Sequence, residues 1–244
     1  GEQWILIVNA EDDDNSLFLV RPVVESPEDI VQLTETQVFA LTGNSVSIVD
    51  DGSLVLFVDA DNFLRLVSTD GEFETVLSED GEWFSIALSP DGSKLAATTV
   101  FQDTTLFIFD LDVPDDSKAI RLYNPTSQEG VTTDDVLFAD AMDWDLSSQY
   151  VVYDAFNAIP IAGGDTLAYW NVNLLDVEHE LIIPLFAAQG EGFHLANPSF
   201  SSTSDDFMVF DFLFEDSDDP EQSLNSIWVY DLFSGAVGFI EYTD

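Results

Sequence analysis

The sequence contains no cysteine in 244 residues. This absence excludes disulfide bridges, thiol catalysis and metal sites built on thiolates. Histidine is also scarce: there are two, His179 and His194, and no Gly-x-Ser-x-Gly turn accompanies them. A Ser-His-Asp hydrolase site and a histidine zinc site are therefore not expected. Apolar runs stay shorter than the ~18 residues of a membrane-spanning helix, so we predict no membrane insertion.

Positive charge is almost missing from the chain. Five Lys and Arg face 48 Asp and Glu, which gives a formal net charge of −43. Such a chain repels nucleic-acid phosphate and anionic membrane surfaces. Because the carboxylates also repel one another, we expect high salt, bound divalent cations or a basic partner to offset the charge. The composition favours an extracytoplasmic protein, in the periplasm, at the cell surface or secreted into a saline or calcium-containing medium.

Apolar and aromatic residues are abundant, and they fall into short alternating runs. The clearest unit spans Phe84–Asp112. Alternation predicts a first strand at Phe84–Leu88, a second at Lys94–Val100 and a third at Leu106–Leu111. Between the first two lies Ser89-Pro90-Asp91-Gly92-Ser93, where proline presets φ and glycine accepts a positive φ. The pattern indicates antiparallel strands joined by tight turns.

Three further units repeat the pattern of strand, turn and strand. The residues aligned at the turn are Gly52, Gly92, Ser148 and Ser204. The apolar residues aligned before the turn are Ile48, Leu88, Trp144 and Phe200. Those aligned after the turn are Val55, Leu95, Val151 and Phe207. Recurrence at fixed spacing is the signature of a repeat fold, so Trp144 and Phe200 are predicted to pack between neighbouring units.

Third strands align in five units, at Leu17–Val20, Phe63–Leu66, Leu106–Phe109, Leu167–Trp170 and Ile227–Tyr230. First strands number only four, because Trp4–Ala10 matches the second strand of unit one. The sequence predicts an all-β fold, a β-propeller of about five four-stranded antiparallel blades whose first blade is incomplete. We assign residues 1–244 to a single propeller domain, with approximate blades at 1–36, 37–80, 81–125, 138–185 and 195–244. In a closed propeller the other terminus can supply such a strand, but this chain ends after a fourth strand. We therefore expect the chain to be part of a longer polypeptide or to have lost an N-terminal segment.

The repeat resembles that of TolB-type propellers, whose units read roughly Pro-x-Trp-Ser-Pro-Asp-Gly followed by a strand and a Leu-Tyr-Val-x-Asp segment. Ser89–Gly92 with Leu106–Asp112 is the closest copy, and Pro198–Ser201 with Ile227–Asp231 is the next. The fourth and fifth units lack the Pro-Asp-Gly turn. The resemblance implies a propeller similar to periplasmic scaffold proteins and to the non-catalytic propeller domains of some serine peptidases.

Acidic clusters in the predicted turns and rim loops are candidate sites for Ca²⁺, which takes about six to eight oxygen ligands. A turn gathers neighbouring carboxylates into a small volume, where a cation relieves their repulsion. The alternative is a solvated acidic loop, since no cluster has the spacing of a helix-loop-helix calcium site. The candidate metal ligands are Asp12, Asp13, Asp14, Asp59, Asp61, Asp110, Asp112, Asp115, Asp116, Asp216, Asp218 and Asp219.

Paired carboxylates leave one catalytic alternative open. Propellers that resemble this one in size include glycosidases whose acidic residues line a central funnel, and such enzymes need two carboxylates ~5–10 Å apart. The candidates are Asp143, Asp145, Asp154 and Asp211, which lie on or beside predicted inner strands. Solvated or turn-capping roles explain the same residues. For the histidines we predict a solvated strand edge at His179 and a loop before the fifth blade at His194.

The leading hypothesis is a non-enzymatic, extracytoplasmic propeller that acts as a scaffold or binding module. Its acidic rim loops would engage a cation such as Ca²⁺ or a basic protein partner, and an open blade edge would allow self-assembly. The alternatives are a carboxylate-dependent glycosidase and the accessory propeller domain of a serine peptidase whose hydrolase domain lies outside this chain.

Overall fold

The computed structural model describes residues 5–8, 16–38, 45–49, 51–125, 136–160, 164–187, 189–215 and 223–240. Within these ranges the chain forms β-strands and two short 3-10 helices, η1 (Pro27–Asp29) and η2 (Pro114–Asp116). The described part of the chain holds no helix with the length and apolarity that crossing a membrane requires.

The strands form five antiparallel sheets, each built from strands that follow one another in sequence. Sheet 1 contains β1 (Ile5–Val8), β2 (Leu17–Val20) and β3 (Ile30–Gln32). Sheet 2 contains β4 (Val46–Ile48), β5 (Leu54–Val58), β6 (Leu64–Ser68) and β7 (Glu74–Ser78). Sheet 3 contains β8 (Trp83–Leu88), β9 (Lys94–Thr99), β10 (Thr105–Asp110) and β11 (Lys118–Arg121).

The two C-terminal sheets have the longest strands. Sheet 4 contains β12 (Val136–Trp144), β13 (Tyr150–Pro160), β14 (Thr166–Asp176) and β15 (Leu181–Pro184). Sheet 5 contains β16 (Phe193–Ser201), β17 (Ser204–Phe214), β18 (Leu224–Asp231) and β19 (Val237–Phe239). The strands β13, β14 and β17 have 11 residues each, whereas β5 and β6 in sheet 2 have 5.

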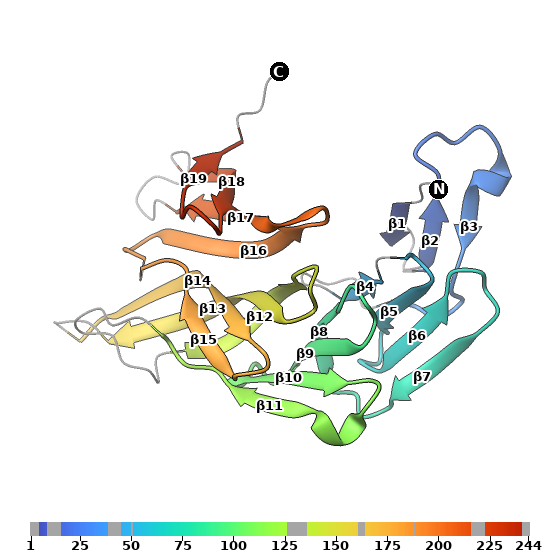
Figure 1. Cartoon of the computed structure of the whole chain (residues 1–244), viewed down its shortest axis with the longest axis horizontal. Coiled ribbons are helices and arrows are strands. Elements are labelled where there is room, and N and C mark those ends of the chain that lie inside the picture. The colour runs from blue at the N-terminus through green and yellow to red at the C-terminus, as the bar shows by residue number, and fades with distance from the viewer. Residues whose placement is uncertain are drawn as a thin grey trace.

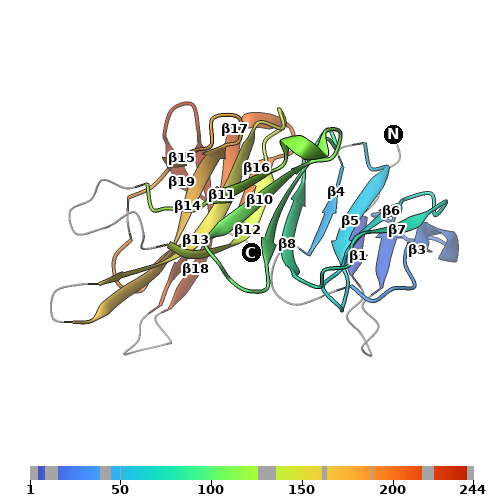
Figure 2. The ribbon, with the colours of Figure 1, turned by 90° about the horizontal axis from the view of Figure 1, so that it is seen from below.

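The five sheets are the blades of a β-propeller, as the repeat predicts. Figure 1 shows them following one another along an arc, with sheets 1 and 5 at its two ends, and Figure 2 shows the same blades from below. The first strands face a common centre, since β4 contacts β8, β8 contacts β12 and β12 contacts β16. Sheet 1 has three strands in the described chain, and β1 takes the second-strand position. Within the described residues the first blade is therefore incomplete, as the sequence predicts.

Three blades share one turn between their first two strands. Gly52, Gly92 and Ser148 all have positive φ, at 71°, 71° and 57°. Each donates its N–H to the carbonyl three residues earlier, at 2.8 to 3.0 Å. The cross-strand pairs that flank the turns are Ile48 with Val55, Leu88 with Leu95, and Trp144 with Val151. The predicted alignment of these three blades is correct, and Ser148 replaces glycine without changing the turn.

In the fifth blade the predicted register is wrong by one residue. Ser201 pairs with Ser204, so a tighter two-residue turn joins β16 to β17, and Phe200 lies opposite Met208. Ser204 lacks the positive φ of Gly52. Because a one-residue slip moves a side chain to the other face of the sheet, Met208 is 0% exposed, while Phe207 is 43% exposed.

Apolar clusters fill the space between neighbouring sheets. Sheets 3 and 4 share the largest cluster, which includes Leu106, Trp144 and Tyr153. The Trp144 indole N–H also donates to the Ala87 carbonyl of sheet 3, at 2.8 Å. Phe200 lies in the cluster between sheets 4 and 5. The prediction that Trp144 and Phe200 pack between blades is confirmed, and removal of such apolar surface from water stabilises the stacking of blades.

Candidate functional site

The centre of the arc holds a cavity of about 360 Å³, the central channel. Residues from β1 and from the first strands of the other four sheets line it. They are Leu6, Val46, Ser47, Ile48, Ile86, Ala87, Ala141, Met142, Asp143, Asn197, Pro198 and Ser199. Among these described residues Asp143 is the one carboxylate.

Asp143 connects the fourth blade to the fifth. One carboxylate oxygen, Oδ2, accepts hydrogen bonds from the Ser199 hydroxyl at 2.9 Å and from the Phe200 N–H at 2.8 Å. The other oxygen accepts from the Trp144 N–H at 2.9 Å. Because both oxygens already have donors from the protein, the contacts give Asp143 a structural role between β12 and β16.

Asp154 on β13 accepts hydrogen bonds from two irregular strands, β12 and β16. The register of β12 breaks between Ala139 and Met142, and that of β16 breaks between Ala196 and Ser199. Such bulges leave backbone N–H groups without a partner in the ladder. The carboxylate of Asp154 accepts three of them: the N–H groups of Asp140 at 3.2 Å, Ala141 at 2.8 Å and Asn197 at 2.9 Å.

Burial has the largest effect on the pKa values of Asp154 and its neighbour Asp140. It raises the pKa of Asp154 to about 7, against the opposing hydrogen bond from the Asn197 N–H, and the charge of Asp140 adds to the rise. Burial also raises the pKa of Asp140 to about 6, and its buried Oδ1 has no hydrogen-bond partner among the described residues. A raised pKa suits a general acid. Asp154, however, is 2% exposed and both its oxygens are engaged.

The other two candidates for carboxylate catalysis also have partners within the protein. Asp145 accepts from the N–H groups of Gln149 at 2.9 Å and Tyr150 at 2.7 Å, and from the Ser147 hydroxyl, so it closes the turn before β13. Asp211 accepts from the side-chain amide of Asn197 at 2.9 Å. Neither residue is part of the described lining of the central channel.

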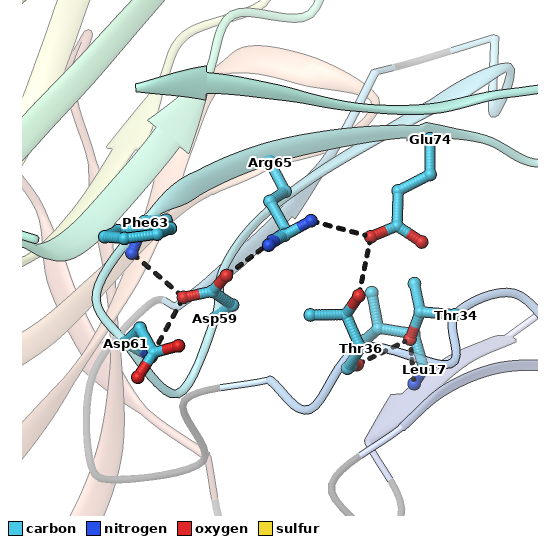
Figure 3. A network of polar contacts seen from close by, with 8 residues as sticks. All are labelled: Leu17, Thr34, Thr36, Asp59, Asp61, Phe63, Arg65 and Glu74. Atoms are coloured by element: carbon cyan, nitrogen blue, oxygen red, sulfur yellow. Dashed lines mark hydrogen bonds and ion pairs between the residues drawn. The ribbon is translucent and has the colours of Figure 1, made fainter. Parts of the chain in front are cut away.

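Of the predicted metal ligands that the structure describes, Asp59 is the most deeply buried, at 2% exposed. Figure 3 shows that its Oδ1 accepts from the N–H groups of Asp61 and Phe63, at 2.9 and 3.0 Å. Its Oδ2 binds Arg65 Nε at 2.5 Å, and Arg65 Nη1 reaches Glu74 at 3.3 Å. The hydrogen bond to Asp59 raises the pKa of Arg65. A guanidinium group thus supplies the positive charge beside Asp59.

The remaining metal candidates are the half-buried Asp110 and residues that are exposed or lie outside the described ranges. Asp110 accepts from the N–H groups of Asp112 at 3.1 Å and Val113 at 2.7 Å. The exposed candidates are Asp61, Asp112, Asp115 and Asp116. Those outside the described ranges are Asp12, Asp13, Asp14, Asp216, Asp218 and Asp219. Within those ranges no group of three or more His, Asp or Glu is placed to hold a metal ion.

Calcium binding stays a prediction, and a thermal melt at low ionic strength tests it. A ligand at about 100 times its Kd adds about 2.7 kcal/mol to the native state. For a chain of this size that raises Tm by about 5 to 10 °C. We therefore expect CaCl₂ to raise Tm relative to chelator, with KCl at matched ionic strength as the control for screening. Equal Tm in CaCl₂, chelator and KCl would remove the calcium hypothesis.

A larger cavity, of about 1040 Å³, lies between sheets 4 and 5, and we call it the blade 4–5 groove. Its lining combines aromatic rings with carboxylates and, among the described residues, includes no Lys or Arg. It comprises Phe156, Asp165, Thr166, Leu167, Ala168, Trp170, Glu191, Gly192, His194, Leu213, Phe214, Glu215, Ser223, Leu224 and Asn225. The sequence analysis did not predict this groove. The feature that could have indicated it is the unusual length of the strands β13, β14 and β17.

His194 lies in the groove on β16, so the prediction of a loop position is wrong. Pairing of Phe193 with Phe214 extends the hairpin of β16 and β17 beyond the predicted blade and includes His194 in it. The His194 Nδ1 accepts the Trp170 N–H at 3.2 Å, and its Nε2 lies 3.9 Å from Glu215. Burial lowers the pKa of His194, against the charge of Glu215, so the imidazole is neutral at pH 7.

His179 is solvated, as the sequence predicts, but it lies in a turn and not at a strand edge. Its side chain is 69% exposed, and its Nδ1 lies 2.9 Å from Asp176 Oδ2. It follows the end of β14, in the turn that leads to β15.

No protein-family model and no curated protein sequence matches the chain. Solved structures do resemble it in fold. TolB from Acinetobacter baumannii has a TM-score of 0.62 at 13% identity, over 96% of this chain and 50% of that one. An oligogalacturonate lyase from Vibrio parahaemolyticus has a TM-score of 0.59 at 14% identity, over 97% and 61%. A prolyl endopeptidase has a TM-score of 0.55 at 12% identity, over 99% and 35%.

The chain therefore has a TolB-like β-propeller fold, which also resembles part of the prolyl endopeptidase chain in structure. It spans half the length of the TolB chain and about a third of the prolyl endopeptidase chain. The proteins that share the fold include a lyase and an endopeptidase, so fold alone does not assign an activity.

Proposed function

We propose that this propeller is a non-enzymatic, extracytoplasmic scaffold or binding module whose acidic surface engages a basic protein partner or a cation. Ion pairs made by three of the five basic residues support this function. Arg21 pairs with Asp29, Arg65 with Asp59 and Glu74, and Lys118 with Glu180. These basic side chains neutralise only a few carboxylates. The many remaining carboxylates need positive charge from outside the chain.

The roles of the candidate carboxylates support the non-enzymatic reading. Asp143, Asp145 and Asp154 each accept backbone N–H groups that hold turns, bulges or neighbouring blades. The excess of acidic groups favours surroundings rich in salt or divalent cations, as outside the cytoplasm.

Self-assembly at the first blade is a further part of the proposal. In the described chain β1 pairs with β2 alone, and Ile5 and Ile7 are 49% and 42% exposed. An unpaired strand edge beside apolar side chains favours pairing with a second copy. A single monomeric species at all concentrations in sedimentation equilibrium would contradict self-assembly.

Binding to a basic probe tests the main function. We expect a fluorescent peptide rich in Lys to bind the chain, and its counterpart with Glu in place of Lys not to bind. Because the attraction is electrostatic, affinity should fall steeply as salt rises. Equal anisotropy changes with the two peptides would contradict a charge-selective binding module.

Hydrolysis assays address the enzymatic alternatives. Glycosides incubated with the chain and with its Asp143→Asn variant should release no sugar in either case. Turnover by the chain that Asp143→Asn abolishes would replace the proposed function with a carboxylate-dependent glycosidase.

A further inference from the structure

Part of β14 has a free edge. β13 pairs with β14 along its whole length, from Thr166 to Asp176. On the other side β15 pairs only with residues Asn173 to Asp176. Figures 1 and 2 show the hairpin of β13 and β14 extending past β15. In the described chain no strand pairs with the outer edge of β14 at 166–172.

Backbone groups on this edge point into the blade 4–5 groove. The Trp170 N–H donates to His194 on β16, so it points away from β13. Alternate residues of a strand direct their N–H and C=O to the same side. Thr166 and Ala168 therefore present theirs beside Trp170, and both line the groove. The edge offers a ladder of donors and acceptors to an extended chain.

The rim of the groove is acidic and its wall is aromatic. Asp165, Glu191 and Glu215 are exposed, and the Glu215 side chain is 75% exposed. The Trp170 ring packs against Phe156, with ring centroids 5.2 Å apart. An aromatic face beside carboxylates attracts cationic side chains. Anionic ligands are repelled, because the described lining has no Lys or Arg to balance the three carboxylates.

Gly192 brings the backbone of Glu215 beside that of Glu191. The Glu215 N–H donates to the Gly192 carbonyl at 2.7 Å, which places Glu215 next to the residue that follows Glu191. A Cβ on Gly192 would lie 2.4 Å from the Glu215 carbonyl oxygen, and φ at this position is +75°. Only glycine permits this close approach, so the backbone at Gly192 fixes where the backbone of Glu215 lies.

We propose that the blade 4–5 groove binds an extended peptide segment that carries Lys or Arg, by adding it as a strand to the edge of β14 at 166–168, beside the Trp170 N–H that His194 accepts. This rests on the proposed binding function and names its site and ligand class. Main-chain hydrogen bonds to Thr166 and Ala168 supply affinity, as in other cases of strand addition. The carboxylates of Glu191 and Glu215 select basic side chains.

Fluorescence anisotropy with a labelled peptide that alternates Lys and Val tests this site. Glu191→Gln with Glu215→Gln should weaken binding by about tenfold. The control, Glu72→Gln with Glu79→Gln, removes the same charge from exposed positions on either side of β7 and should change affinity less than about twofold. Circular dichroism of each variant checks that the fold is intact.

Two further measurements test the strand pairing itself. Ala168→Pro removes the edge N–H, which a strand edge tolerates, and should weaken binding while thermal stability changes little. A peptide N-methylated on the pairing face should bind the unaltered chain as weakly as the unmodified peptide binds the Ala168→Pro variant. If the peptide binds the chain but the groove variants bind equally well, the groove is not the site, although the binding function stands. If the unaltered chain does not bind the peptide, both proposals fail.

Discussion

Replacing Asp154 by alanine should lower the free energy of unfolding by about 3 to 5 kcal/mol. The carboxylate accepts N–H groups from Asp140, Ala141 and Asn197, and the residue is 2% exposed. Each buried donor that loses its acceptor costs about 1–3 kcal/mol, so three orphaned donors exceed the effect of an ordinary core substitution. Urea denaturation, with the m-value checked for constancy, measures the loss.

Asp154→Asn is the matched variant for this position. It keeps one acceptor oxygen but replaces the other with an amide nitrogen, which cannot accept a hydrogen bond. We expect an intermediate loss in the free energy of unfolding, of about 1–3 kcal/mol, because the backbone N–H groups of one bulge keep their acceptor. A free energy of unfolding within about 0.5 kcal/mol of the unaltered chain for Asp154→Ala would show that the carboxylate does not support the two bulges.

Asp154 and Asp140 together predict how the stability of the fold depends on pH. The folded pKa values, about 7 for Asp154 and about 6 for Asp140, lie above the ordinary value of 3.8. Between about pH 4 and pH 7 the folded state therefore binds more protons than the unfolded state, and stability falls as pH rises. Asp140→Asn should gain stability over the unaltered chain at pH 8 and match it near pH 4. Asp115→Asn, at an exposed position, controls for the loss of one negative charge.

Replacing Arg65 by methionine should cost about 3–5 kcal/mol. The substitution leaves the Asp59 side chain, which is 3% exposed, without its counter-charge, and breaking a buried ion pair from one side has this magnitude. Arg21→Met is the matched control: its partner Asp29 lies 3.3 Å away, and the Arg21 side chain is 40% exposed. That pair should contribute about 1 kcal/mol or less, since solvent screens it.

A double-mutant cycle separates charge from packing at Asp59. If the unpaired charge is the cause, Asp59→Asn should restore part of the stability lost in Arg65→Met, because a neutral amide needs no counter-charge. Denaturation midpoints of the four proteins give the coupling energy. Equal losses for Arg65→Met and Arg21→Met would show that Asp59 does not depend on the guanidinium.

The sequence predicts the blades because their signals are local. Alternating apolar residues define the strands, and the turns at Gly52 and Gly92 need only a few neighbouring residues to close. Trp144 is assigned correctly to blade packing for the same reason. The assignment fails in the fifth blade, where Ser201–Ser204 has no Asp-Gly signal and the choice between two turn lengths depends on which of Phe207 and Met208 is buried.

The sequence by itself determined an acidic propeller with an incomplete first blade, because repeat spacing, composition and turn chemistry can all be read along the chain. Only the tertiary structure decided what the carboxylates do. Asp154 accepts hydrogen bonds from bulges in two blades, Asp59 pairs with Arg65 across the turn between β5 and β6, and Glu191 and Glu215 line the same groove. With 48 acidic residues, sequence offers no way to choose among them. Burial and hydrogen-bond partners make the choice. The partners of Asp154 come from distant strands, and the burial of Asp59 arises only when the strands pack.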